Sequence, residues 1–335
     1  MHHSAVVILN YNTRSLLEEL LPKVIEHSPD SHIVLADNAS TDGSAEFISG
    51  QFPNVQLIKI PSNLGFAGGY NYALKQVQAK YYVLLNSDVE TSPNWLNPLI
   101  NHLENNDNTA AVQPKIKDYY RRDYFEYAGA CGGFIDKFGF PFCRGRIFGN
   151  IEKDTGQYNS NIPIFWATGA ALCIRSKVWE EAGGLDEMFF AHMEEIDLCW
   201  RIHNMGHQIY CLPESTVYHM GGGTLSNLNP RKTFLNFRNG LYMLHKNVPQ
   251  NSRNKIIFIR KALDGLAAIL FLFTGKASHV RQIYKAHIAF EKTKHLLAVS
   301  DSKLPTSGVL NKSLAKEYFL FGRKVFSSLR IYIIK

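Results

Sequence analysis

The chain has 335 residues, of which 45% are hydrophobic and 19% are charged. This composition excludes an intrinsically disordered chain, and the length predicts a sizeable globular domain with an appendage. The formal net charge is +7, and the excess of basic residues lies after residue 250, so the rest of the chain is mildly acidic.

The five cysteines are scattered, odd in number and never spaced as C-x-x-C. This pattern excludes a disulfide framework or a zinc knuckle and indicates a reducing compartment. The start of the chain enters a strand-like run without a long apolar leader, so we expect no signal peptide and a cytoplasmic location.

The first 90 residues alternate between strand and helix patterns. Helical periodicity covers 13–28 and 68–80, and four apolar strand-like runs cover 5–12, 31–40, 54–63 and 81–88. This alternation predicts an α/β fold with a mostly parallel sheet flanked by helices. Each strand ends in a polar cluster, and the carboxyl ends of parallel strands meet at one edge, where ligands bind. The sequence therefore predicts a site at that edge.

The pattern changes after residue 110. The segment 110–165 is rich in glycine and aromatic residues and favours antiparallel strands and turns, 193–206 fits a helix, and 207–219 fits a strand. Helices dominate from residue 230. The most apolar segment, 255–276, is too short and too charged to span a bilayer. It fits either an interfacial membrane helix beside basic residues or a buried helix or subunit contact, including one in a homodimer.

Two candidate ligand groups follow from these strand ends. Asp37 precedes a turn and is free to accept hydrogen bonds from a ligand, whereas Asp42 is expected to cap the next helix. Asp88 ends an apolar strand, and a single carboxylate holds Mg²⁺ or Mn²⁺ when substrate phosphates complete the coordination. His219 ends a later strand and is a second candidate metal ligand. For Asp88 and His219 alone, a turn or a surface position remains the competing interpretation.

An acidic cluster, Glu194, Glu195 and Asp197, begins a helix directly after an aromatic stretch. A partly desolvated carboxylate has a raised pKa and can act as a general base. The alternatives are an ordinary acidic helix start and an ion pair between Asp197 and Arg201, four residues apart.

Seven ordered motifs together carry a family resemblance: VVILNYN, ADNASTDGS, NLGFAGGYN, LLNSD, ATGAALCIR, FFAHMEEIDLCWR and VYHMGGG. Their order resembles the family 2 glycosyltransferases of the GT-A fold, and within them the rhamnosyltransferase-like branch. The resemblance covers about residues 4–245. We therefore expect a GT-A domain over 1–245 and a helical, basic extension over 246–335.

The resemblance implies an inverting transfer of a sugar from a nucleotide-diphosphate donor with Mg²⁺ or Mn²⁺ as cofactor. Asp88 and His219 would hold the metal, and Glu195 would be the base, with Glu194 and Asp197 as the other candidates. The positions that it places along the donor are Tyr11, Asp37, Asn63, Gly65, Asn71 and Asn86. Two departures stand out, because Asn86 replaces the first Asp of the usual D-x-D element and Glu195 replaces the usual Asp base.

The expected donor is dTDP-rhamnose or a UDP-sugar, and the expected acceptor is a hydroxyl of a surface glycan carried on a lipid. A nucleic-acid partner is not expected. The rival functions are a non-catalytic nucleotide-sugar or glycan-binding protein and a dinucleotide-dependent oxidoreductase. The second is disfavoured because the first strand–helix turn, NYNTRS, has no glycine for a pyrophosphate.

Overall fold

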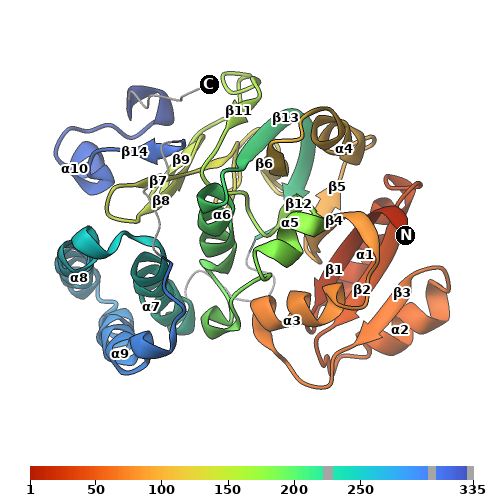
Figure 1. Ribbon diagram of the computed structural model, residues 1–335, viewed down its shortest axis with the longest axis horizontal. Helices are drawn as coiled ribbons and strands as arrows, with labels where there is room; N and C mark the ends of the chain where they lie inside the picture. Colours follow the sequence, from red (N-terminus) through yellow and green to blue (C-terminus); the bar gives the residue numbers. More distant parts are fainter. Residues whose placement is uncertain (222–228, 301–306, 330–335) are drawn as a thin grey trace.

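The computed structural model describes residues 1–221, 229–300 and 307–329 (Figure 1). Gly222 and Gly223, which belong to the VYHMGGG motif, lie outside the described residues. A nine-stranded mixed sheet forms the centre of the fold, with the path β11-β13-β6-β12-β4-β1-β2-β3 and β5 paired to β13. Its strands are β1 His2–Asn10, β2 His32–Asp37, β3 Gln56–Lys59, β4 Ala79–Asn86, β5 Val89–Thr91, β6 Thr109–Asp118, β11 Ile162–Pro163, β12 Ala171–Arg175 and β13 Gln208–His219.

The predicted parallel half of this sheet is confirmed. β1 pairs in parallel with β2 and β4, and β2 pairs in parallel with β3. β12 is inserted antiparallel between β4 and β6, and β13 runs parallel to β6. The sheet is therefore mixed, because β12 runs antiparallel to its two neighbours and both β5 and β11 run antiparallel to β13.

Alternation of side chains along the strands divides the core into two layers. Val6 and Ile8 of β1 pack on one face of the sheet, whereas Ala5 and Val7 pack on the other. Helices α1 Arg14–Glu26, α2 Ser44–Gln51 and α4 Leu96–Asn105 cover the first face. Helices α3 Gly65–Leu74, α5 Ser176–Glu181 and α6 Glu194–Asn204 cover the second.

A smaller five-stranded sheet packs beside the second face. It has the order β10-β9-β8-β7-β14 and contains β7 Gly133–Asp136, β8 Pro141–Cys143, β9 Arg146–Ile147, β10 Asn150–Ile151 and β14 Val309–Leu310. β14 pairs in parallel with β7, and Phe326 lies against the rings of Phe134, Phe142 and Tyr158. The C-terminal extension therefore completes this sheet as well as contributing helices.

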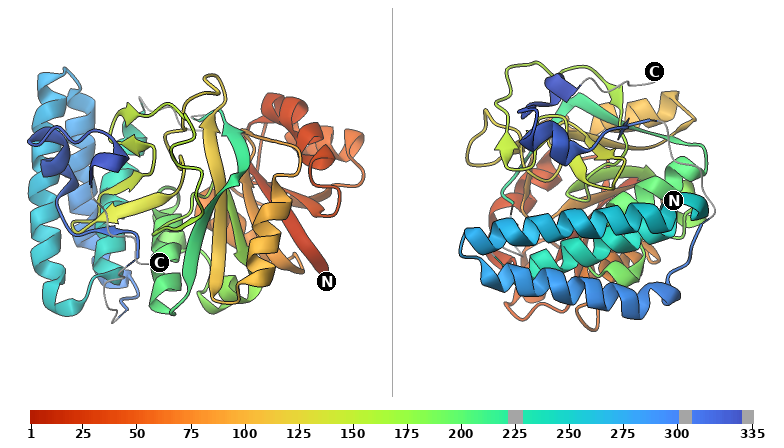
Figure 2. Two further views of the ribbon diagram at one scale, coloured as in Figure 1. Left: turned by 90° about the horizontal axis from the view of Figure 1, so that it is seen from above. Right: turned by 90° about the vertical axis from the view of Figure 1, so that its left-hand side faces the viewer.

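The remaining helices gather at the end of the molecule opposite α1 and α2 (Figure 2). They are α7 Pro230–Asn247, α8 Gln250–Phe273, α9 Ala277–Thr293 and α10 Leu314–Phe319, with short 3-10 turns η2 Lys294–Leu296 and η3 Phe326–Leu329; a further 3-10 turn, η1 Glu187–Phe189, lies between α3 and α7. α7, α8 and α9 pack against one another, and α7 also contacts α6. The domain boundary at 245 stays a prediction, and α7 runs across it.

The buried-helix interpretation of segment 255–276 is wrong for one face of α8. The side chains of this face, which we call the α8 apolar stripe, are solvent-exposed: Phe258, Leu266, Ile269, Leu270, Leu272 and Phe273. Among the helices that the structure describes, none is long and apolar enough to cross a membrane.

A buried ion pair fastens α8 to the smaller sheet. Arg260 donates from Nε to Asp264 at 2.9 Å and from Nη1 to the carbonyl of Gly139 at 2.8 Å, and it lies over the ring of Phe140. Asp264 is fully buried and also contacts Nε2 of His287 at 3.1 Å. Removing one partner of such a pair leaves an uncompensated buried charge.

We expect Asp264→Ala to lower the free energy of unfolding by about 3–5 kcal/mol, the usual cost of breaking a buried pair. Glu291→Ala is the matched control, because Glu291 pairs with Lys261 and Lys294 at half-exposed positions, and it should cost about 1 kcal/mol or less. Denaturant and thermal melts of both variants measure the difference. Equal losses would contradict the anchoring role of the Arg260–Asp264 pair.

Candidate active site

The polar strand ends meet at the carboxyl edge of the central sheet, as the sequence predicts. Asn10 at the end of β1 pairs with Asp37 at the end of β2, and Leu9 pairs with Asn86 at the end of β4. Asn10 donates from Nδ2 to Oδ1 of Asp37 at 2.8 Å and to Oγ of Ser40 at 2.9 Å. These contacts join the ends of β1 and β2 into one rim, and the pairing of β1 with β4 places the end of β4 beside it.

The other predicted donor positions line this rim. Tyr11 is 38% exposed, and Asn63 is exposed on the loop after β3. Asn38 joins the two loops, because its Nδ2 donates to Oδ1 of Asn63 at 3.2 Å and to the carbonyl of Gly65 at 3.0 Å. Asp42 accepts from the backbone N–H of Ser44 at 3.1 Å, but the N-cap of α2 is Gly43, so Asp42 lies one residue before the cap position that was expected for it. Contact of the rim residues with a nucleotide stays a prediction.

Gly65 has a structural reason to be glycine. Its φ of +73° lies in the left-handed region, and a Cβ there would come 2.4 Å from the carbonyl oxygen of Phe190. The backbone N–H groups of Phe66 and Ala67 donate to that same carbonyl, at 2.7 and 3.2 Å. The glycine therefore lets the start of α3 touch the segment that precedes the acidic cluster.

Asp88 and His219, 131 residues apart, come together in a buried contact. Nε2 of His219 lies 3.0 Å from Oδ1 of Asp88, and Nδ1 lies 3.3 Å from Oε1 of Glu126. Burial opposes the charged form of the imidazole, but the two carboxylates overcome it and raise the pKa of His219 well above its usual value. Glu126 was not predicted, because nothing in its local sequence marks it.

This pair fits a divalent cation that shares its coordination with a substrate. No group of three or more His, Cys, Asp or Glu side chains within 1–221, 229–300 and 307–329 is arranged to hold a metal by itself. Asp88 and His219 place one candidate oxygen ligand and one candidate nitrogen ligand next to each other. Mg²⁺ and Mn²⁺ sites of this kind take the remaining ligands from phosphates and water.

The acidic cluster follows a strained backbone segment. Three non-glycine residues in a row of four have positive φ: Phe190 at 65°, His192 at 72° and Met193 at 73°. Such conformations cost about 1–3 kcal/mol each and persist only where surrounding contacts enforce them. They end directly at the first residue of α6, Glu194.

One side chain holds this segment directly, and a second holds the chain that precedes it. Asn239 of α7 is fully buried, and its Nδ2 lies 2.9, 2.9 and 2.7 Å from the carbonyls of Phe189, Ala191 and His192. Asn71 of α3 exchanges two hydrogen bonds with the backbone of Leu185, at 2.7 and 3.0 Å. These bonds use both the Nδ2 and the Oδ1 atom of Asn71, so they do not favour a contact of Asn71 with a donor. That contact stays a prediction.

Glu194 and Glu195 carry carboxylate oxygens ready to accept a proton. In the described part of the chain, Oε2 of each has no hydrogen-bond partner. Burial and then the charge of Glu195 raise the pKa of Glu194 well above its usual value, whereas burial raises the pKa of Glu195 to about 7, against backbone hydrogen bonds that lower it. Glu194 is the more deeply buried of the two, and the two neighbouring carboxyl groups titrate as a pair.

Asp197 has a different environment from its two neighbours. It is fully buried, and its carboxylate contacts Nζ of Lys246 at 3.0 Å, Nε of Arg201 at 3.0 Å and Nδ2 of Asn247 at 2.7 Å. The expected ion pair with Arg201 is thus confirmed. These three donors give Asp197 a structural function between α6 and α7 and leave it poorly suited to act as a base.

Lys232 of α7 connects the two parts of the site. Burial lowers its pKa, and the charges of Glu126 and Asp88 oppose that shift. The same lysine acts on His192, because burial and then the charge of Lys232 lower the pKa of that imidazole to about 4. The charge of Lys232 therefore acts both on the Asp88–His219 region and on His192, which precedes the acidic cluster. Lys232 was not singled out from the sequence, because it lies in the long C-terminal helical region without a motif.

Comparison with known sequences identifies a family. The sequence model described as Glycosyl transferase family 2 matches residues 5–171. The N-acetylglucosaminyl-diphospho-decaprenol L-rhamnosyltransferase of Mycobacterium tuberculosis is 26% identical over 233 residues, which cover 64% of this chain and 75% of that protein. The low-salt glycan biosynthesis hexosyltransferase of Haloferax volcanii is 21% identical over 283 residues, covering 82% of this chain and 87% of that protein.

Solved structures share the fold. GalNAc-T7 with UDP, GalNAc and Mn²⁺ superposes with a TM-score of 0.61 at 16% identity, over 88% of this chain and 58% of that one. The mannosyltransferase PcManGT from Pyrobaculum calidifontis, in complex with GDP-Man and Mn²⁺, gives 0.51 at 13% identity, over 88% and 87%. With the ordered motifs and the sheet-edge site, these matches show that the chain is a glycosyltransferase of family 2 with a GT-A fold, similar to the rhamnosyltransferases.

Proposed function

We propose that this enzyme transfers a hexose, with inversion, from dTDP-rhamnose or a UDP-sugar to a hydroxyl of a lipid-linked surface glycan, using Mg²⁺ or Mn²⁺. The observation that carries the proposal is the buried, unpartnered Oε2 atom of Glu195, in a chain that also brings Asp88 and His219 together. The names of the related rhamnosyltransferase and hexosyltransferase support the donor and acceptor classes.

The reaction needs a base for the acceptor and a stabilised leaving group. Glu195 would accept the proton of the acceptor hydroxyl as its oxygen attacks the anomeric carbon opposite the diphosphate. A divalent cation held by Asp88 and His219 would supply charge neutralisation at the leaving diphosphate. Lys232 adds a positive charge near Asp88. The rim around Asp37 would hold the nucleobase and ribose of the donor. A single displacement of this kind inverts the anomeric configuration.

The α8 apolar stripe supports attachment to the membrane that carries such an acceptor. Exposed basic residues follow it along α9: Lys276, Arg281 and Lys285. An apolar helix face beside basic residues is typical of helices that lie in the interface of an anionic bilayer. We propose that α8 rests on the cytoplasmic face of the membrane, near the lipid-linked acceptor.

Glu195→Gln should reduce kcat by about 10²- to 10⁴-fold, the usual contribution of a general base, because the amide cannot accept the proton. Binding of the nucleotide, measured by thermal shift with UDP, dTDP and GDP donors, should persist, since the change is isosteric. Glu194→Gln is the matched control and should lose less. Near-normal turnover by Glu195→Gln would transfer the role to Glu194.

The pH profile gives an independent check. Since the pKa of Glu195 is raised to about 7, the base is protonated and inactive below that pH, so log kcat should rise with unit slope toward pH 7 and level off above it. The residual activity of Glu195→Gln should lack this limb. A profile that is flat between pH 5 and 8 in the wild type would contradict a Glu195 base.

Membrane attachment is tested by co-sedimentation with vesicles. The wild type should bind phosphatidylglycerol vesicles at low salt, and Leu266→Ser/Phe273→Ser should lose most of that binding because two apolar contacts are removed. Tyr120→Ser is the control, because Tyr120 is an exposed aromatic residue that lies outside α8. If the wild type ignores vesicles and sediments as a dimer that the double variant abolishes, the stripe binds a second copy of the chain instead.

A further inference from the structure

Glu126 is a buried carboxylate at the site for which neither the motifs nor the mechanism above give a use. It is 6% exposed and faces His219 from the side opposite Asp88. Nδ1 of His219 makes no hydrogen bond within the described residues, and the Oε1 atom of Glu126, 3.3 Å away, is its ion-pair partner. The imidazole is therefore held between two carboxylates that have different surroundings.

The backbone fixes Glu126 in place. Its N–H donates to the carbonyl of Ile116 on β6 at 3.1 Å, and its Oε2 accepts from the N–H of Ala128 at 2.5 Å. The preceding residue, Phe125, donates to the carbonyl of Glu152 at 3.1 Å. Only Oε1 remains to face the histidine.

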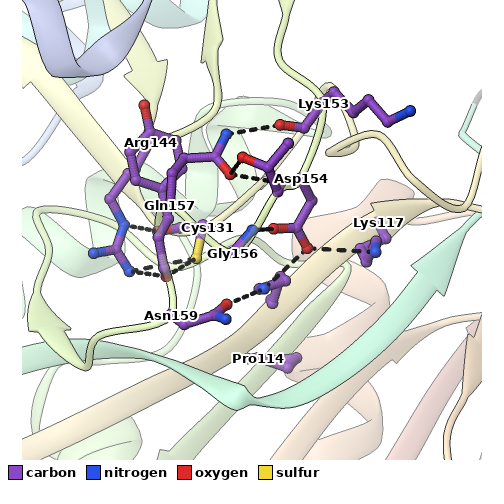
Figure 3. Close-up of polar contacts among 12 residues, drawn as sticks. Pro114, Lys117, Cys131, Arg144, Lys153, Asp154, Gly156, Gln157 and Asn159 are labelled. Carbon is purple, nitrogen blue, oxygen red and sulfur yellow. Dashed lines mark hydrogen bonds and ion pairs between the residues drawn. The ribbon is translucent and has the colours of Figure 1, made fainter.

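Ion pairs also hold the chain around Asp154 against β6, next to the segment that contains Glu126. Oδ2 of Asp154 lies 3.0 Å from Nζ of Lys115 and 3.3 Å from Nζ of Lys117, and Figure 3 shows Lys117 and Asp154 facing each other. Both lysines belong to β6, the strand that also bonds the N–H of Glu126. The segment that presents Glu126 is thus braced on both sides.

The chain beyond β13 leaves room for the carboxylate. Gly221, two residues after His219, has a φ of +65°, and a Cβ there would come 3.2 Å from Oε1 of Glu126. The first glycine of the GGG run in the VYHMGGG motif therefore has a spatial reason linked to Glu126.

We propose that Glu126 is a positioning residue that accepts the Nδ1–H of His219 and so directs the Nε2 lone pair toward the cation beside Asp88. Carboxylates that bond the distal N–H of a ligating histidine fix its tautomer and ring orientation in many metal sites. The proposal rests on the metal use proposed above. Asp88 acts directly on the cation, whereas Glu126 acts through the imidazole.

Binding of Mn²⁺ alone and of Mn²⁺ with inorganic pyrophosphate, followed by the electron paramagnetic resonance signal of free Mn²⁺, provides the first test. Glu126→Ala should weaken Mn²⁺ binding about 10- to 100-fold, the usual effect of removing such a partner. Glu126→Gln keeps an acceptor oxygen and should recover part of the loss. Asp88→Ala and His219→Ala should lose more than either.

Glu90→Gln is the matched control. Glu90 lies on β5 opposite Tyr218, next to His219, and is buried, but its carboxylate pairs with Lys23 and Arg122. Its neutralisation should leave Mn²⁺ binding unchanged. A loss equal to that of Glu126→Ala would show a general charge effect and overturn the positioning role.

A second readout does not depend on the metal. In protein labelled with ¹⁵N-histidine, the Nδ1–H of His219 should give a downfield, slowly exchanging resonance, with or without Mg²⁺, and Glu126→Ala should abolish it. An unchanged resonance in that variant overturns the proposal. If the resonance behaves as expected but the wild type binds no Mn²⁺ in either condition, the metal use fails while the Glu126–His219 contact stands.

Discussion

The hydrogen bonds from α7 to the backbone before α6 are the constraint on which the site depends. Three carbonyls of a strained segment accept hydrogen bonds from the amide of Asn239. Lys246, seven residues further along α7, contacts both Asp186 and Asp197. These contacts hold the segment with positive φ values that leads directly into Glu194 and Glu195. The chemistry of the acidic pair is thus supported from outside the sheet.

The same logic applies at the opposite side of the site. The carboxyl edge is rigid because Asn10, Asp37 and Ser40 bond one another below the surface. Gly65 then joins that edge to the acidic segment through the carbonyl of Phe190. The rim, the loop held by Asn239 and the histidine held between two carboxylates are therefore all fixed by contacts within the protein.

Much of this could be predicted from the sequence where periodicity is local. The parallel strands β1 to β4, the polar strand ends and the approach of His219 to Asp88 agree with the pattern or with the ordered motifs. The inserted antiparallel β12 and the completion of the smaller sheet by β14 could not be predicted, because pairing between strands that are distant in the sequence leaves no periodic signal. Glu126, Lys232 and Asn239 were missed for the same reason, since each acquires its function only from a distant partner. The exposure of the α8 apolar stripe was left open because an apolar helix pattern does not say what covers it.

The position of α7 in the chain has a consequence for how the enzyme matures. The central sheet can form from residues 1–221, and domains generally begin to fold from the N-terminus as they leave the ribosome. Lys246 and Asn247, however, follow residue 245, and β14 follows residue 308. A nascent chain of residues 1–221 therefore contains every strand of the central sheet but lacks Asn239 and Lys246, which hold the acidic segment. The contacts that position the acidic segment can form only after α7 has been synthesised, later than all the strands of the central sheet.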